Sequence, residues 1–216
     1  MPLRQLADSS ILLVDDHVIV RQGCRDLLVR AGARRIEEAT DGEDAYRRYV
    51  EHPADVVVMD LSMARLSGLD TIQRITRRDP AARIVVFSMH DEPMFVLRAL
   101  RAGAQCYVTK TSPPDELVVA IRTALKGGRH LSHDVAQALA MSGALTRENP
   151  LGVLTAREFE ICRLVSLGRT NAQIGELLSI SAKSVSNAVG RIREKLGVES
   201  TSELVRLAVG QELFKE

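Results

Sequence analysis

The sequence predicts two domains: an α/β domain with a doubly wound, five-stranded parallel sheet, and a small all-α domain after it. Short apolar runs alternate with amphipathic helical segments between residues 11 and 127. Such alternation with short connections is typical of a parallel sheet that has right-handed crossovers and helices on both faces. After residue 150 only helical segments separated by short turns are found. We therefore expect domains at residues 10–127 and 151–216, joined by a linker with a short helix at 128–150.

The predicted strands are short apolar runs, and glycines and prolines mark the ends of the helices between them. The five strands are Ile11–Asp16, Arg35–Ala39, Val56–Ser62, Arg83–His90 and Gln105–Lys110. Each is followed by a segment with apolar residues three or four positions apart, such as Leu69, Ile72 and Ile75. These helices are expected to stop at Gly32, His52-Pro53, Asp79-Pro80, Gly103 and Gly127.

Composition and charge exclude several classes of protein. Of the 216 residues, 45% are hydrophobic and 26% charged, as in a soluble globular protein. No apolar run approaches the roughly 20 residues that cross a bilayer, and the first residues lack the apolar core of a signal peptide. We therefore expect a cytoplasmic protein without a membrane partner. The net charge of +1 means that any nucleic-acid binding must come from local patterning.

The three cysteines, Cys24, Cys106 and Cys162, are far apart in the sequence and have apolar neighbours. Their spacing supports neither a disulfide framework nor a zinc site. We expect them to be small buried hydrophobic residues in a reducing compartment.

Four of the five predicted strands end in a polar functional group. Ligands of parallel sheets bind at the carboxyl ends of the strands, so these groups are expected to converge at one edge. Clustered carboxylates repel one another, and a bound Mg²⁺ removes that conflict. A carboxylate can also attack phosphorus and become an acyl phosphate, while a cation and a hydroxyl stabilise the phosphoryl oxygens. The groups are Asp15 with Asp16, Asp60, Ser88 and Lys110.

Residues Ile11 to Lys126 resemble the receiver domain of two-component response regulators, which has a flavodoxin-like fold. The resemblance is carried by VDDH (Val14–His17), by MDLSM (Met59–Met63) with Gly68, and by Ser88 and Lys110. It implies that Asp60 accepts a phosphoryl group from a phosphohistidine on a sensor histidine kinase.

The same resemblance assigns further roles around Asp60. It implies that Mg²⁺ is held by Asp15, Asp16, Asp60 and the backbone carbonyl of Ser62. Tyr107 would be the aromatic residue that moves as Ser88 follows the phosphate. His17 and His90 are interpreted as loop or helix-start residues that bind no metal. Many relatives have proline where this chain has Ala64, which predicts a looser loop and an altered lifetime of the phosphorylated state.

The second domain is predicted to contain four short helices, because side-chain caps and stops recur along it. Capping boxes are expected at Thr155 with Glu158 and at Thr170 with Gln173, and further caps at Ser181 and at Ser200 with Glu203. The tight turn between the second and third helices predicts a helix-turn-helix. In the third helix Val185, Val189, Ile192 and Leu196 form an apolar stripe. The opposite face is polar, which suits either solvent or the edges and phosphates of DNA.

Residues Leu154 to Ala208 resemble a LuxR-type DNA-binding domain through LTARE, GRTNAQIGELLSIS and KSVSNAVGRIREKLGV. With the receiver domain, this identifies the chain as similar to the NarL/FixJ class of transcription regulators. The resemblance implies binding of double-stranded operator DNA through Lys183, Ser184, Ser186, Asn187, Gly190, Arg191 and Lys195, and a homodimer in the active state. Relatives commonly carry threonine and histidine where Ser184 and Ala188 stand, which predicts weaker binding or an unusual target.

Two choices remain open at this point. The last helix, Thr201 to Gly210, has Leu204, Leu207 and Ala208 on one side, either as a dimer surface or as packing within the small domain. The whole chain has two rival interpretations: a phosphatase with an aspartate nucleophile, or a regulator that works without phosphorylation. Such phosphatases usually have a second aspartate two residues after the nucleophile, where this chain has Ser62, so we expect no turnover enzyme. The acidic pair and Lys110 argue against the second rival.

Overall fold

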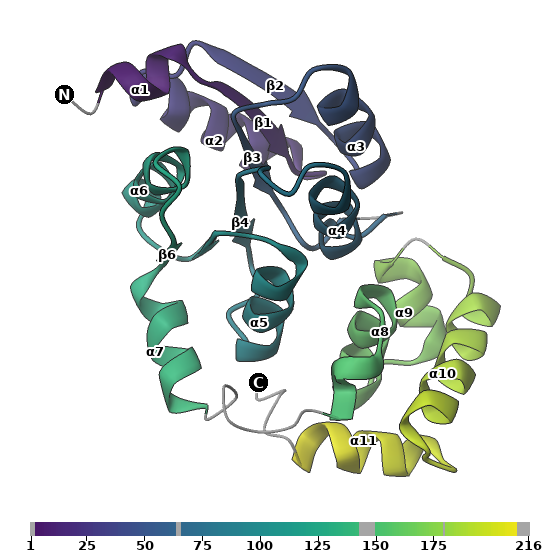
Figure 1. Cartoon of the computed structure of the whole chain (residues 1–216). Helices are drawn as coiled ribbons and strands as arrows, with labels where there is room; N and C mark the ends of the chain where they lie inside the picture. The colour runs from purple at the N-terminus through teal and green to yellow at the C-terminus, as the bar shows by residue number, and fades with distance from the viewer. Residues whose placement is uncertain (1–2, 64–65, 143–149, 179, 211–216) are drawn as a thin grey trace. The chain divides into compact units, whose positions relative to one another are not determined.

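The computed structural model describes residues 3–63, 66–142, 150–178 and 180–210; Ala64 lies outside these ranges. The chain divides into two compact units, residues 1–139 and residues 140–216, and each is described by itself. Figure 1 shows a sheet covered by helices in the first unit and helices alone in the second.

In its described residues, the first unit is built on a parallel sheet of six strands in the order β2-β1-β3-β4-β5-β6. All five predicted strands are present, but the predicted count is wrong, because β6 adds to the edge beside β5. A strand of two residues is too short to show a periodicity of its own, and it lies in the stretch expected to be linker. The strands are β1 (Ser10–Val14), β2 (Arg35–Ala39), β3 (Val56–Met59), β4 (Ile84–Ser88), β5 (Cys106–Thr109) and β6 (His130–Leu131).

Helices cover both faces of the sheet. Figure 1 shows α2 and α6 on one face and α3, α4 and α5 on the other. The N-terminal helix α1 was not predicted; its Leu6 is fully buried and joins the core beneath α2 and α6. Helix α7 occupies the weakly helical patch expected in the linker. The helices are α1 (Leu3–Asp8), α2 (Val18–Arg30), α3 (Gly42–Glu51), α4 (Gly68–Arg78), α5 (Pro93–Ala102), α6 (Pro114–Leu125) and α7 (His133–Met141).

Alternate residues of each strand fill the cores on the two sides of the sheet. Ile11 and Leu13 of β1 belong to the core under α2 and α6, whereas Leu12 and Val14, also buried, point to the other face. All four residues of β3 are buried, as expected for a strand covered on both sides. Cys24, Cys106 and Cys162 are free and buried, which confirms their interpretation as core residues.

Between residues 150 and 210, the described part of the second unit contains a short 3-10 helix, Pro150–Val153, and the four predicted helices. Both predicted capping boxes form, and Ser181 accepts a hydrogen bond from the N–H of Ser184. Gly197, in the left-handed conformation with φ 65°, ends the third helix as expected for a C-cap. The helices are α8 (Ala156–Ser166), α9 (Asn171–Leu177), α10 (Ala182–Leu196) and α11 (Thr201–Gly210).

Two apolar details of this unit settle questions that the sequence left open. Leu204 and Ala208 of α11 are fully buried, and α11 packs on α8. The packing alternative is therefore right for these two residues, and the dimer surface that included them is wrong. Ala188 is only 4% exposed, so its departure from the family pattern lies in the core and not on the polar face of α10.

In the described part of the chain, no helix is long and apolar enough to span a membrane.

Two glycines of the second unit give opposite predictions. A Cβ at Gly190 meets no atom within 4 Å, whereas one at Gly175 lies 2.6 Å from the carbonyl oxygen of Ile180. We expect Gly190→Ala to stabilise the unit by about 0.5 to 1 kcal/mol, because alanine restricts the unfolded chain. Gly175→Ala is expected to destabilise it by roughly 1 to 3 kcal/mol through overpacking. Hydrogen exchange of α10 peptides measures the stability change in both variants. Exchange that is slower in Gly175→Ala than in wild type would contradict the close contact of residue 175 with the Ile180 carbonyl.

Candidate functional site

The sheet places the predicted polar groups side by side at the carboxyl ends of its strands. β1 and β3 are neighbours, and the backbone N–H of Asp60 donates to the carbonyl of Val14 at 2.9 Å. Chain order reverses between these two strands, which is where parallel α/β sheets bind ligands. On the next two strands, the N–H of Lys110 donates to the carbonyl of Ser88 at 2.8 Å.

The centre of the site is the ammonium group of Lys110. Its Nζ lies 2.8 Å from Asp15 Oδ2 and 2.8 Å from Asp60 Oδ2. The side chains of Lys110, Asp15 and Asp60 are 7%, 3% and 1% exposed, so these charges are largely removed from water. One cation thus compensates two buried carboxylates that come from different strands.

Burial and neighbouring charges shift the acid–base properties of this pair. Burial raises the pKa of Asp60, and Asp15 adds to the shift, while Lys110 opposes it without cancelling it. Burial lowers the pKa of Lys110, but the two carboxylates outweigh it and the pKa is raised. Lys110 is therefore a permanent cation beside a carboxylate that is more basic than usual.

Asp16 and His17 complete a group of possible metal ligands. Ligand atoms of Asp15, Asp16, His17 and Asp60 lie within 4.8 Å of one another. His17 Nδ1 is 2.8 Å from Asp16 Oδ1, and the backbone N–H of His17 donates to Asp15 Oδ1 at 2.8 Å. Three carboxylates at one point are the hard oxygen donors that Mg²⁺ prefers, so the residues present fit this ion. The His17 side chain is 64% exposed and can swing away.

A second group of contacts involves His90, whose role the sequence did not reveal. His90 Nε2 lies 2.8 Å from the hydroxyl of Ser62, two residues after Asp60. Its ring stacks on Phe95 with centroids 3.9 Å apart, and its carbonyl accepts a hydrogen bond from the Tyr107 hydroxyl at 2.7 Å. His90 therefore joins the loop after β3 to the loop after β4. A lone histidine after a strand carries no sequence signal for such a contact.

Ser88 and Tyr107 are both inside the protein. The Ser88 hydroxyl is fully buried and accepts a hydrogen bond from the N–H of His90 at 3.3 Å. Tyr107 is fully buried, and burial raises its pKa well above 10.0. In this conformation the ring of Tyr107 occupies the interior and fixes the loop that follows Ser88.

Gly68 is required by the close approach of α4 to the loop that follows β3. A Cβ at this position would lie 2.0 Å from the carbonyl oxygen of Asp60 and 2.7 Å from Cα of Leu61. The N–H of Gly68 donates to the carbonyl of Leu61 at 3.2 Å. The backbone of Asp60 is thus held in place by a contact that only glycine allows.

The strand end that carries Lys110 is also connected to α7. Thr109, fully buried, donates its hydroxyl to Asp134 Oδ2 at 2.5 Å, and Ser112 donates to Asp134 Oδ1 at 3.2 Å. Burial raises the pKa of Asp134, but its hydroxyl donors outweigh burial and lower it. A carboxylate at the start of α7 therefore binds the loop that begins at Lys110.

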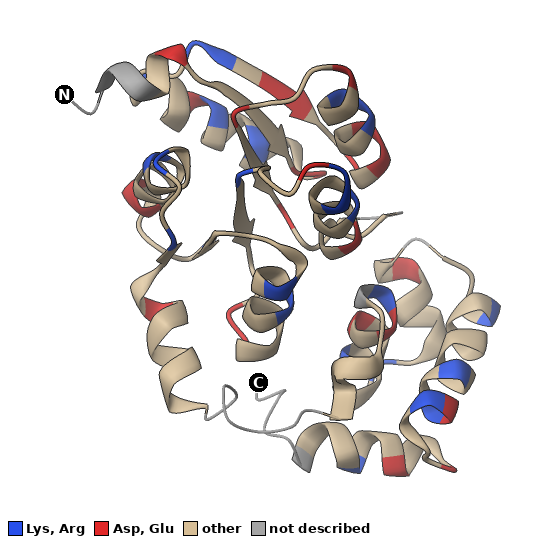
Figure 2. Cartoon of the chain, viewed as in Figure 1, with Lys and Arg blue, Asp and Glu red and all other residues tan. Residues whose placement is uncertain are grey.

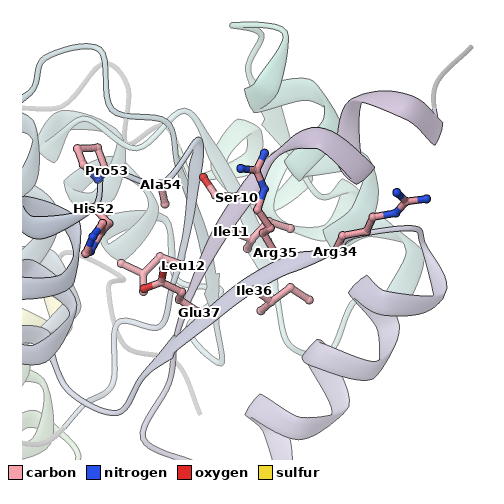
Figure 3. Close-up of a pocket in the computed structure, with 10 residues that line it drawn as sticks. All are labelled: Ser10, Ile11, Leu12, Arg34, Arg35, Ile36, Glu37, His52, Pro53 and Ala54. Carbon is pink, nitrogen blue, oxygen red and sulfur yellow. The ribbon is translucent and has the colours of Figure 1, made fainter.

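A hollow of about 470 Å³ lies at the opposite, amino-terminal ends of the strands. Figure 3 shows residues of β1 and β2, among them Ser10, Arg35 and Glu37, together with His52 and Pro53 from the turn before β3. Because parallel strands run in one direction, this hollow and the acidic cluster are at opposite edges of the sheet. It contributes no group to the site around Asp60.

In the second unit, α10 exposes the polar face that the sequence predicted. Lys183, Ser184, Ser186, Asn187, Gly190 and Arg191 are exposed, and Val185, Val189 and Ile192 are buried. Figure 2 shows basic residues spaced along this helix. Lys195 differs, because its Nζ donates to Glu158 Oε2 at 2.6 Å and so joins α10 to the capping box of α8. The Ser184 hydroxyl lies 2.8 Å from that of the helix cap Ser181.

Two family models match the chain, one for each unit. The response regulator receiver domain matches residues 11–122, and the luxR family of bacterial regulatory proteins matches residues 152–208. The chain therefore belongs to the response regulators that combine a receiver domain with a LuxR-type DNA-binding domain, and the predicted resemblance is confirmed.

Similar proteins span nearly the whole chain. Response regulator UvrY of Escherichia coli (strain K12) is 34% identical over 203 residues, covering 93% of this chain and 93% of UvrY. Oxygen regulatory protein NreC of Staphylococcus haemolyticus is 32% identical, covering 94% of this chain and 98% of NreC.

Solved structures of response regulators are similar to part or nearly all of the chain. A LuxR-family two-component response regulator from Aurantimonas sp. SI85-9A1 has a TM-score of 0.61 and 46% identity, covering 63% of this chain and 98% of that chain. The response regulator RcsB in complex with DNA has a TM-score of 0.59 and 25% identity, covering 93% of this chain and 98% of RcsB.

The contact of Gly68 with Asp60 predicts a local loss of stability on substitution. We expect Gly68→Ala to destabilise the first unit by roughly 1 to 3 kcal/mol, because its Cβ must displace backbone. Gly23→Ala is the matched control: it lies in α2, where a Cβ meets nothing within 4 Å, and should be neutral or slightly stabilising. Hydrogen exchange of α4 and β3 peptides distinguishes the two. Equal exchange in both variants would refute the close contact.

The Glu158–Lys195 pair predicts a pH dependence for the second unit. Burial raises the pKa of Glu158, but Lys195 and the Thr155 N–H outweigh burial and lower it below 4.5. A lowered folded pKa means that the contribution to stability is fully present above pH 4.5 and is lost as the pH falls through the folded pKa. Glu158→Gln should therefore lower stability at pH 7 by about 1 kcal/mol and flatten the acid-side decline.

Thermal unfolding of the second unit between pH 7 and acid tests this expectation. Lys195→Met is the reciprocal control, because it removes the other half of the same pair and should reduce stability at pH 7 by a similar amount. A wild-type decline that persists unchanged in Glu158→Gln would show that other carboxylates are responsible.

Proposed function

We propose that the chain is a phosphorylation-controlled transcription regulator in which Asp60 accepts the phosphoryl group of a sensor histidine kinase. The observation that supports this most strongly is the buried Lys110 ammonium, 2.8 Å from both Asp15 and Asp60. It supplies a positive charge at the point where a phosphoryl group on Asp60 would place its oxygens.

The transfer is a displacement at phosphorus. An Asp60 oxygen forms the new P–O bond as the P–N bond to the kinase imidazole breaks, and the imidazole nitrogen keeps the electron pair and then takes a proton. The raised pKa of Asp60 makes its carboxylate a better nucleophile than an exposed aspartate. Lys110 would release Asp60 and bind a phosphoryl oxygen, while Ser88 would turn its hydroxyl from His90 toward another.

Asp15, Asp16, Asp60 and the carbonyl of Ser62 would hold Mg²⁺, which neutralises charge on the phosphoryl oxygens when bound. The residue two positions after Asp60 is Ser62, whose hydroxyl lies against His90 and is not a carboxylic acid. The site therefore contains no general acid at that position, which supports stoichiometric phosphorylation in place of turnover.

The output would be binding of operator DNA through the exposed face of α10. RcsB, which resembles this chain along its length, has been solved with DNA. Lys183, Ser186, Asn187 and Arg191 present donors and acceptors to the major groove, with Ser184 and Gly190 beside them. Phosphorylation would favour a homodimer that reads two half-sites, and a regulator that binds DNA would work in the cytoplasm. Lys195 would act through Glu158 and not through DNA.

Intact-mass spectrometry after incubation with Mg²⁺ and acetyl phosphate tests the acceptor. Wild type is expected to gain one phosphoryl group, and Asp60→Asn to gain none, because the amide is no nucleophile. Asp26→Asn, an exposed aspartate on α2, is the matched control and should be phosphorylated like wild type. An adduct that survives in Asp60→Asn would move the acceptor elsewhere.

The same samples are then tested for oligomeric state on a sizing column and for DNA preference by selection from random duplexes. We expect the phosphorylated wild type to dimerise and to enrich a two-fold symmetric sequence. Enrichment that is equally strong in Asp60→Asn would show that DNA binding does not depend on phosphorylation.

A further inference from the structure

A hollow of about 450 Å³ in the second unit lies beside the exposed face of α10. Residues of the α8–α9 turn, the start of α9, one side of α10 and the start of α11 surround it. Each polar side chain that lines it carries at least one N–H or O–H donor. These side chains are Arg169, Thr170, Asn171, Ser186, Arg193 and Thr201.

The charge around this hollow is positive. Two guanidinium groups, Arg169 and Arg193, line it, and none of the described residues lining it is an aspartate or glutamate. Two other cations of the same unit are paired with carboxylates: Arg157 lies 2.9 Å from Glu160, and Lys195 lies 2.6 Å from Glu158. The hollow thus combines two positive charges with a lining that offers them no counter-ion.

Arg193, which lines the hollow, has one unsatisfied hydrogen-bond donor. Its Nε is buried and has no hydrogen-bond partner among the residues that the structure describes. A buried donor without a partner is unfavourable, so an acceptor that reaches Arg193 would remove that cost. A guanidinium presents its donors in a planar fork, which matches the oxygens of a phosphate.

The position of the hollow identifies which anion it meets. Ser186 and Gly190 belong both to its lining and to the face of α10 proposed to enter the major groove. A Cβ at Gly190 would meet nothing within 4 Å, so the space above the helix is open there. When α10 lies in a major groove, the groups along its flank face the sugar-phosphate backbone.

We propose that this hollow binds one backbone phosphate of the DNA, with Arg193 and Arg169 as its charged ligands. The proposal rests on the proposed function and adds residues that the polar face of α10 did not include. A phosphate held there positions α10 in the groove without reading a base, because every nucleotide carries the same phosphate.

The experiment measures binding of the phosphorylated full-length chain to two duplexes, the selected operator and a scrambled one, over a range of KCl concentrations. Arg193→Met is expected to weaken binding to both duplexes by a similar factor, roughly tenfold or more. It should also reduce the slope of log affinity against log salt by about 0.9, because one phosphate contact is lost. Arg169→Gln should act in the same direction.

Two further variants separate this role from charge and folding in general. Arg193→Lys keeps the charge and should keep the salt slope while losing part of the affinity, because an ammonium cannot form the planar fork. Arg206→Gln removes an arginine of α11 that is 77% exposed and does not line the hollow, and should change neither quantity. Circular dichroism of each variant confirms that the unit is folded.

The outcomes distinguish this inference from the function on which it rests. If wild type binds DNA and Arg193→Met binds with the same affinity and slope, the phosphate site is refuted and the proposed function stands. If Arg193→Met changes the preferred sequence without changing the slope, Arg193 contacts a base and the proposal is wrong. If phosphorylated wild type binds neither duplex, both the function and the inference fail.

Discussion

The first unit depends on the position of one ammonium group. Lys110 lies 2.8 Å from carboxylates that follow two different strands, and all three side chains are almost completely buried. Buried charges are tolerated when they are paired with good geometry, and removal of one partner is strongly unfavourable. The parallel sheet supplies that geometry, because it brings the ends of β1, β3 and β5 to the same edge.

This arrangement also explains how a chemical event at Asp60 can spread through the unit. Any group that takes Lys110 away from Asp60 acts on a strand end connected to α7 through Thr109, Ser112 and Asp134. On the other side, His90 joins Ser62 to the loop that holds Ser88 and Tyr107. The loops around Asp60 are therefore linked to their neighbours by hydrogen bonds.

In the second unit too, one charged side chain joins two separate elements. Glu158 caps α8 and also pairs with Lys195 of α10, so one carboxylate fixes both the start of a helix and the crossing of two helices. This contact pairs Lys195 with a carboxylate, whereas Arg193, two positions earlier, has a buried Nε without a hydrogen-bond partner among the described residues. Two basic residues of one helix thus have different surroundings.

The sequence by itself determined the strands, the helix caps, the family and the residues at the strand ends. These features are local or periodic: Asp60 directly follows an apolar run, and Thr155 with Glu158 spans one helical turn. Only the tertiary structure decided which distant groups meet. Three contacts join segments far apart in the chain: β6 with β5, His90 with Ser62, and Lys195 with Glu158. The burial of Ala188 likewise depends on how the helices pack. Such contacts depend on three-dimensional packing, which no short window of residues encodes.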